Sequence, residues 1–317
     1  MNIKLHALLF TAIVVVVVFV TNGGGRRARV SPAEAVDPPL VVTREARPFS
    51  FYSASLDEAP VSSDVRRVPA RNWEVLDPTV SAQAVLVQSL DDSFPFYHYN
   101  TYTLWPTASL TKFLTAVVVL EDIGADEKVI VTKRAADAAG SKVGLRDGEI
   151  YTAEDLLKIM VLASSNDAAI AFEDHVGLDE FVRLINKKAG VLGMGRSIFH
   201  DGSGLSDLNQ STANDLLRLV RYIVEKHPTV FQWTRSPSVL VQPVNSDESR
   251  VIYNINPLSS RVNFLGGKTG TSSAARENLV TLLSHNGQRL VVIVLGSWDR
   301  VRAVDTLLEW IGDAYSL

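Results

Sequence analysis

Residues Ser109 to Leu120 read SLTKFLTAVVVL, and this stretch decides how the chain around it folds. Its first turn is polar and the rest is apolar on almost every side, a pattern typical of a helix that runs into the middle of a domain. We therefore expect a central, buried helix whose first turn, just after Pro106, lies at the edge of the core.

More helices are predicted towards the C-terminus. Residues Thr152 to Asp155 form a capping-box pattern ahead of an apolar helix that stops at Ser164-Ser165-Asn166. A polar break of this kind lets a hydroxyl and an amide project into a cleft between two helices. Further helices are expected from Asp167, over 178–188 and over 211–226.

Strand patterns lie on both sides of this helical middle. Residues 80–87 and 96–103 predict a β-hairpin, and strands return from Ser238. Two apolar runs, 279–284 and 289–295, flank Asn286-Gly287, a strong turn signal for a second hairpin. A last helix is expected over 300–311. Strands at both ends with helices between them predict one α+β unit whose terminal segments share an antiparallel sheet.

The N-terminal end carries an apolar segment over residues 7–20. About fourteen residues make a helix of about 21 Å, short of the ~30 Å hydrocarbon core, so length favours a signal peptide. The small-x-small site at 33–35 lies far beyond the apolar residues, which favours an uncleaved anchor. Arg26, Arg27 and Arg29 conflict with export under the positive-inside rule, and function must decide between the two orientations.

We therefore predict a signal or transmembrane anchor over residues 1–22, with the anchor preferred. Residues 23–78 have no sustained helical or strand period and carry seven prolines: Pro32, Pro38, Pro39, Pro48, Pro60, Pro69 and Pro78. Such a segment cannot offset the entropy of ordering by burial, so we expect a disordered linker. One globular domain is predicted over 79–317.

Composition excludes several classes of function. The chain of 317 residues has a net charge of −4, so it lacks the basic excess that nucleic-acid binding needs. It has no cysteine, which excludes disulfides, a thiolate nucleophile and cysteine-held metal sites. Its six histidines are scattered without a HExxH pair, so we expect no metal and no cofactor.

Ser109 is the serine with a base built in by local geometry. Lys112 lies three residues on, and positions i and i+3 share one face of a helix, so the amine can lie beside the hydroxyl. To act as a base Lys112 must be neutral, so its pKa must fall from ~10.4 to near 7. Burial against the apolar run and a second cation, Lys268, could lower it. The alternative is an N-capping serine with a solvated lysine.

The segment Gly267-Lys268-Thr269-Gly270-Thr271 lies in a strand context. Glycines at both ends let another backbone or a ligand approach closely. A peptide substrate could add here as an extra strand, with Lys268 and Thr269 holding its terminal carboxylate. The alternative is an ordinary edge-strand lysine.

In this order and spacing, the Ser-x-x-Lys, Ser-Ser-Asn and Lys-Thr-Gly elements resemble those of the serine D-alanyl-D-alanine carboxypeptidases, the low-molecular-mass penicillin-binding proteins. The stretches PTASLTKFLTA, GLRDGEIYTAEDLLKIMVLASSNDAA, DGSGLSDLNQSTANDL and GGKTGTSSAA resemble that family too. The resemblance covers residues 80–317. It implies a fold of β-lactamase/transpeptidase type, with an antiparallel sheet flanked by helices and an all-helical lobe.

The resemblance also implies roles for individual residues. Ser109 would be the acylated nucleophile, Lys112 its general base and Ser164 a hydroxyl that passes a proton to the leaving D-alanine amine. Asn166 would hold the substrate amide, and Lys268 and Thr269 would bind the carboxylate. The backbone N–H groups of Ser109 and Thr271 would form the oxyanion hole. Arg300 or Arg302 would assist at the carboxylate.

The implied activity is removal of the terminal D-alanine from peptidoglycan stem peptides through an acyl-enzyme, with β-lactams as covalent inhibitors. The protein would then act on the outer side of the cytoplasmic membrane of a bacterium, held by its N-terminal segment. An endopeptidase that cuts peptidoglycan cross-links shares all these elements.

Two other functions stay open. A β-lactamase of class A uses a loop glutamate for deacylation, and 191–210 contains no glutamate, only Asp201 and Asp207 as acidic residues. A non-catalytic β-lactam sensor would not need a buried amine beside a hydroxyl.

Overall fold

The structure is a computed structural model, and it describes residues 68–316. The predicted membrane segment over 1–22 and almost all of the predicted linker lie outside the described residues. Within 68–316, every helix is too short or too polar to cross a bilayer.

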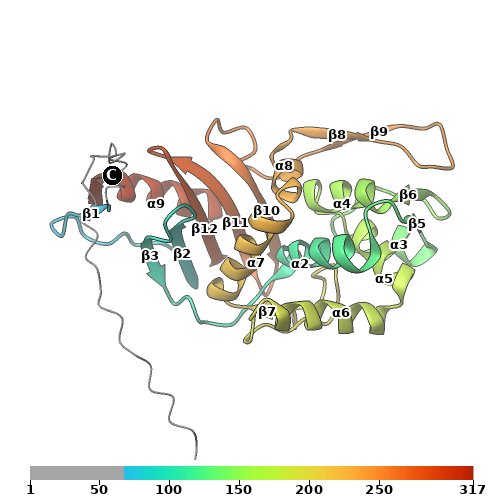
Figure 1. The fold of residues 1–317 in the computed structure, drawn as a ribbon, viewed down its shortest axis with the longest axis horizontal. Coiled ribbons are helices and arrows are strands. Elements are labelled where there is room, and N and C mark those ends of the chain that lie inside the picture. The colour runs from blue at the N-terminus through green and yellow to red at the C-terminus, as the bar shows by residue number, and fades with distance from the viewer. Residues whose placement is uncertain (1–67, 317) are drawn as a thin grey trace, which may run out of the picture. The chain divides into compact units, whose positions relative to one another are not determined.

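A five-stranded antiparallel sheet forms one half of the globular part (Figure 1), in the order β10-β11-β12-β2-β3. Its strands are β2 (Ala84–Ser89), β3 (Pro95–Tyr99), β10 (Phe264–Ser272), β11 (Arg276–His285) and β12 (Gln288–Ser297). The hairpin of β2 and β3 lies beside β12, the last strand of this sheet along the chain, so the prediction that the terminal segments share one sheet is confirmed. Strand β10, which carries Lys268, lies at an edge.

The hairpin predicted around Asn286-Gly287 is confirmed. Strands β11 and β12 pair with His285 opposite Gln288, and Asn286 and Gly287 both have positive φ, 48° and 79°. Two consecutive left-handed residues are what a two-residue type I′ turn needs, because its twist matches that of the flanking strands.

Helices cover both faces of the sheet. Helix α9 (Arg300–Ala314) packs on one face through an apolar cluster with the strands. Helix α7 (Ala213–Lys226) packs on the other face, the side on which the second half of the molecule lies (Figure 1).

That second half is the helical lobe. It consists of α2 (Thr111–Val118), α3 (Lys133–Ala136), α4 (Ala153–Leu162), α5 (Asn166–Val176), α6 (Leu178–Val191) and α8 (Thr229–Arg235). Four short two-stranded sheets lie outside the main sheet among the described residues. At the end of α9, β1 (Ala70–Arg71) pairs with β13 (Tyr315–Ser316). The other pairs are β4 (Trp105–Pro106) with β7 (Gln210–Ser211), β5 (Lys128–Ile130) with β6 (Ile150–Thr152), and β8 (Ser238–Val241) with β9 (Arg250–Tyr253). The predicted α+β class and the helical lobe are both present.

The helix predicted over 109–120 has three parts. A 3-10 turn, η1 (Ala108–Leu110), leads into α2, and a π-helical turn, η2 (Val119–Ile123), ends it. All eight residues of α2 are buried, including Lys112. The tight first turn matters because it presents Ser109 at the edge of the core while the rest of the helix is inside.

We predict that Thr152→Ala lowers the free energy of unfolding by about 1 kcal/mol. The Thr152 hydroxyl caps α4 by accepting a hydrogen bond of 3.2 Å from the Asp155 N–H, and alanine would leave that donor without its partner. Urea denaturation measures the loss. The matched control is Thr103→Ala, at an exposed residue whose hydroxyl makes no hydrogen bond among the described residues; a loss as large in Thr103→Ala would contradict the assignment.

Candidate active site

Ser109 lies at a crowded point between the sheet and the helical lobe. Its neighbour Ala108 has a φ of 46°, an unusual value for a residue with a side chain. Two glycines pack against this turn, Gly270 of β10 and Gly204 of the loop at 201–206. A Cβ on Gly270 would lie 2.7 Å from the Thr107 carbonyl oxygen and 3.2 Å from the Ser109 nitrogen. The prediction that a glycine of this segment allows close approach of another backbone is confirmed.

Lys112 is completely buried beside Ser109. Its Nζ lies 3.1 Å from Ser109 Oγ and 2.7 Å from Asn166 Oδ1, and it also donates to the carbonyl oxygen of Ser203. The predicted i, i+3 pair is therefore formed, and the alternative of a solvated lysine is wrong.

Burial lowers the pKa of Lys112 from 10.5 to about 7, against the opposing pull of the negative charges on Asp201, Glu173 and Asp167. Transfer out of water disfavours the ammonium form, and no carboxylate within residues 68–316 forms an ion pair with the amine to restore it. Near neutral pH a large fraction of Lys112 is thus the free amine that a general base must be.

Ser164 occupies the turn between α4 and α5, with a φ of 55°. The turn is fixed because Ser165 caps α5, accepting from the Ala168 N–H at 3.4 Å. Ser164 Oγ accepts a hydrogen bond of 2.7 Å from Lys268 Nζ, which reaches across from β10. The structure therefore brings all three predicted elements together between the sheet and the helical lobe.

Lys268 is also buried, and its pKa lies well below the usual value. Burial is the main cause, and the positive charges of Lys112 and Arg300 lower it further. From the sequence, we expect Lys268 to lower the pKa of Lys112. Instead, it is the pKa of Lys268 that is lowered by the charge of Lys112. A carboxylate that entered the cleft would restore the charge of Lys268.

Arg300, rather than Arg302, lies at the end of β10. Its guanidinium donates to Thr271 Oγ1 at 2.8 Å and to the Gly270 and Asn278 carbonyl oxygens at 3.2 Å and 3.0 Å. Arg302 lies two residues further along α9 and lines a separate pocket. Thr269 is buried next to Lys268, and Thr271 is exposed at the mouth of the site.

The loop at 201–206 forms one wall of the site, a role that the residue pattern does not predict. Its Ser203 carbonyl holds Lys112, and the Asp201 carboxylate accepts the backbone N–H groups of Gly204 and Ser206. Buried Glu173 of α5 accepts from the Gly202 N–H at 2.9 Å. The two glycines of the DGSG sequence, Gly202 and Gly204, are the sequence feature that could have indicated this role. Each lies too close to a neighbouring group, Phe181 or Ala108, to carry a side chain.

Both aspartates of 191–210 accept hydrogen bonds from other groups, so neither carboxylate is free to act as a base. Asp201 is engaged by the backbone of its own loop, and Asp207 accepts from Ser272 Oγ at 3.0 Å. Across residues 68–316 there is also no cluster of three His, Asp or Glu side chains that could hold a metal ion.

We predict that acylation by a penicillin depends on pH with a half-maximal rate constant near pH 7. The folded-state pKa of Lys112 is lowered, so its reactive neutral form is lost as the pH falls through about 7, and the rate constant should fall about tenfold per pH unit below it. Stopped-flow acylation over pH 5–9, with thermal unfolding as a control for integrity, measures this. A midpoint near pH 10 would contradict the assignment.

We also predict that Gly270→Ala abolishes acylation, because the new Cβ would push β10 away from Ser109. The control is Gly190→Ala on α6, where a Cβ has open space around it and the backbone is helical. That variant should acylate at the rate of the unchanged protein. Equal rates in Gly270→Ala and Gly190→Ala would show that the close approach is dispensable.

Comparison with known proteins agrees with this geometry. The chain is 30% identical to D-alanyl-D-alanine carboxypeptidase DacB2 of Mycobacterium tuberculosis, covering 74% of this chain and 83% of that protein. It is 28% identical to a D-alanyl-D-alanine endopeptidase of Pseudomonas aeruginosa, over 82% of this chain and 86% of that one. The cefotaxime-bound structure of penicillin-binding protein D2 from Listeria monocytogenes superposes with a TM-score of 0.65 at 27% identity, over 74% of this chain and 98% of that one.

The sequence model of one family matches residues 72–298, which is most of the described part. The matched range contains Ser109, Lys112, Ser164 and Lys268. The chain belongs to the peptidase S11 family, the D-alanyl-D-alanine carboxypeptidases.

Proposed function

We propose that this protein is a serine-type D-Ala-D-Ala carboxypeptidase that removes the terminal D-alanine from peptidoglycan stem pentapeptides through an acyl-enzyme. Membership of the S11 family supports the reaction class. The single observation that carries the proposal is the buried Lys112 amine, 3.1 Å from the Ser109 hydroxyl.

In the acylation step, neutral Lys112 accepts the proton of the Ser109 hydroxyl while Oγ attacks the carbonyl carbon of the penultimate D-alanine. The backbone N–H groups of Ser109 and Thr271 stabilise the negative charge on the carbonyl oxygen. Each such donor is worth about 3 kcal/mol in the transition state. Gly270 allows this arrangement because it brings β10 up to the Ser109 turn.

The C–N bond then breaks, and the leaving D-alanine amine takes up a proton. Ser164 is suited to pass it on, because its oxygen accepts from Lys268 and its own hydrogen can point into the cleft. The proton originates from Lys112, which returns to the neutral form. A water molecule then hydrolyses the Ser109 ester, with Lys112 again as the base.

Selection of a C-terminal peptide follows from the cations at β10. Lys268 is buried without an ion pair among the described residues, so a substrate carboxylate supplies the negatively charged partner that its ammonium form lacks. Thr269 adds a hydroxyl beside it. Arg300 is positioned to add positive charge at the end of the strand through its contact with Thr271. Asn166 Nδ2, which donates to the Ala139 carbonyl, has a second hydrogen for the substrate amide.

The alternative is a D-alanyl-D-alanine endopeptidase that cuts cross-links, and the similarity to the P. aeruginosa endopeptidase favours it as the second candidate. A cross-link presents the same D-alanyl carbonyl and a carboxylate next to the amine that leaves. The β-lactamase alternative is weaker, because both aspartates of 191–210 are held by other groups.

Peptidoglycan lies outside the cytoplasmic membrane, so we infer that the domain over 79–317 acts on the outer side. Residues 1–22 would direct the chain there and anchor it, with 23–78 as the linker. β-Lactams would acylate Ser109 as substrate mimics, in line with the cefotaxime-bound form of the Listeria protein.

We predict that Ser109→Ala loses both covalent labelling by penicillin and release of D-alanine from a D-Ala-D-Ala pentapeptide, the latter by at least about a thousandfold. Intact-protein mass spectrometry and a D-alanine assay measure the two. Ser260→Ala, at an exposed serine, is the control and should behave like the unchanged protein. Release from cross-linked dimers alone would establish the endopeptidase, and labelling of Ser109→Ala would refute the nucleophile.

A further inference from the structure

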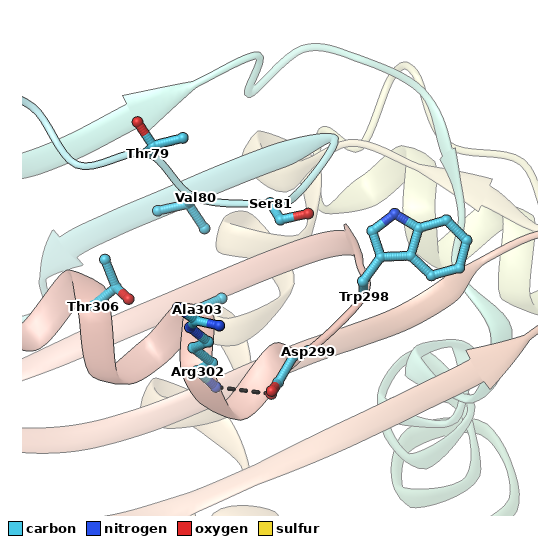
Figure 2. A pocket seen from close by; sticks show the side chains of 8 residues that line it. All are labelled: Thr79, Val80, Ser81, Trp298, Asp299, Arg302, Ala303 and Thr306. Carbon is cyan, nitrogen blue, oxygen red and sulfur yellow. Dashed lines mark hydrogen bonds between the residues drawn. The ribbon is translucent and has the colours of Figure 1, made fainter.

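A pocket of about 520 Å³ lies between the chain that leads into β2 and the first turns of α9, the helix whose first residue, Arg300, contacts Thr271 of the candidate site. Figure 2 shows Trp298 at one end of it, with Asp299, Arg302 and Thr306 on the helix side and Ser81 across from them. Its volume is in the range of sites that bind small molecules. The mechanism above uses none of these side chains.

The direction of the substrate leads towards this pocket, a step that rests on the proposed function. Lys268 and Thr269 hold the carboxylate, and the oxyanion donor is the N–H of Thr271, further along β10. The acyl part of the substrate must therefore leave the cleft past Thr271, towards Ser272 and the turn that connects β10 to β11.

Strand register places Ser297, the residue before Trp298, two strands across the sheet from Thr271. Thr271 pairs with Glu277 of β11, and Glu277 pairs with Ser297 of β12, the residue before Trp298. Two strand spacings of ~4.8 Å put Ser297 about 10 Å from Thr271. Three extended peptide residues at ~3.3 Å each would cover that distance once the chain turned across the end of the sheet.

Trp298 presents an exposed aromatic ring that a neighbouring cation holds in place. The residue is 69% exposed, and the guanidinium of Arg276 lies 4.3 Å from the centroid of its ring. A cation on one side of an indole restricts its motion and leaves the rest of the ring available. A large exposed aromatic ring with polar groups around it is typical of a recognition site.

The polar groups of the pocket suit a sugar. Ser81 and Thr306 offer hydroxyls, and Asp299 offers a carboxylate of which one oxygen caps α9 through the Arg302 N–H at 2.9 Å. The Arg302 guanidinium makes no hydrogen bond or ion pair among residues 68–316. A pyranose has an apolar C–H face for the indole and a rim of hydroxyl and acetamide groups for such partners.

We propose that the Trp298 pocket binds an N-acetylated amino sugar, the glycan end to which a stem peptide is attached. The C–H face of the ring would pack on Trp298, and its polar groups would bind Asp299 and Arg302. The enzyme would thereby favour stem peptides still attached to glycan over free peptides.

Two measurements on the full-length protein test this proposal. In the first, the N-acetylglucosaminyl-N-acetylmuramic acid disaccharide is titrated against the indole N–H signals in NMR spectra. We expect saturable shifts of the Trp298 signal, and binding at least about tenfold weaker in Trp298→Ala and Arg302→Ala. Trp298→Phe should retain part of the affinity. Trp73→Ala, at another exposed tryptophan, is the control and should bind normally. Absence of the Trp298 shift would overturn the proposal, whether or not the enzyme is active.

The second measurement compares kcat/KM for a disaccharide pentapeptide and for the sugar-free pentapeptide. Trp298→Ala should lower the preference for the glycan-bearing substrate about tenfold and leave the sugar-free substrate and penicillin acylation unchanged. An equal loss on both substrates would reduce Trp298 to a structural residue and overturn the proposal. If the unchanged protein cleaves neither substrate but the disaccharide shifts Trp298, the proposed function fails and the sugar site stands.

Discussion

Lys112 and Lys268 lie in a space from which the fold removes water, and the chemistry of the cleft follows from that. Neither amine has an ion pair among the described residues, and each is held by neutral oxygens instead: those of Ser109, Asn166 and Ser203 around Lys112, and those of Ser164 and Thr269 around Lys268. Burial without a counter-ion lowers both pKa values. In the proposed mechanism, Lys112 serves as the base, and Lys268 binds the substrate carboxylate.

This environment exists because four separate segments meet. The first turn of α2, the turn between α4 and α5, strand β10 and the loop at 201–206 each supply one side of it. Gly270 lets β10 approach the Ser109 turn at a distance that a methyl group would prevent. Glu173 and Asp201 fix the loop through backbone N–H groups, and their charges limit how far the pKa of Lys112 falls. The carboxylates thus both hold the wall of the site and adjust its base.

Local patterns in the sequence predict much of this arrangement. The i, i+3 spacing of Ser109 and Lys112, the Thr152 cap and the Asn286-Gly287 turn depend on near neighbours, and all three were predicted correctly. The contact of Lys268 with Ser164 joins residues 104 positions apart and was not predicted; family resemblance had only assigned both residues to one site. The role of the Ser203 carbonyl was missed, because a backbone oxygen leaves no trace in residue type. The sequence could not decide between Arg300 and Arg302, because the choice depends on how α9 is oriented about its own axis.

The most direct test of the account is the protonation of Lys112 itself. Nζ and Cε chemical shifts of labelled lysine, followed from pH 5 to 11 and assigned with Lys112→Arg, report that group without reference to turnover. We expect a midpoint about 3 pH units below the ~10.4 of a solvated lysine. A midpoint at the solvated value would mean that the amine is charged at neutral pH, and the buried-base mechanism would be wrong.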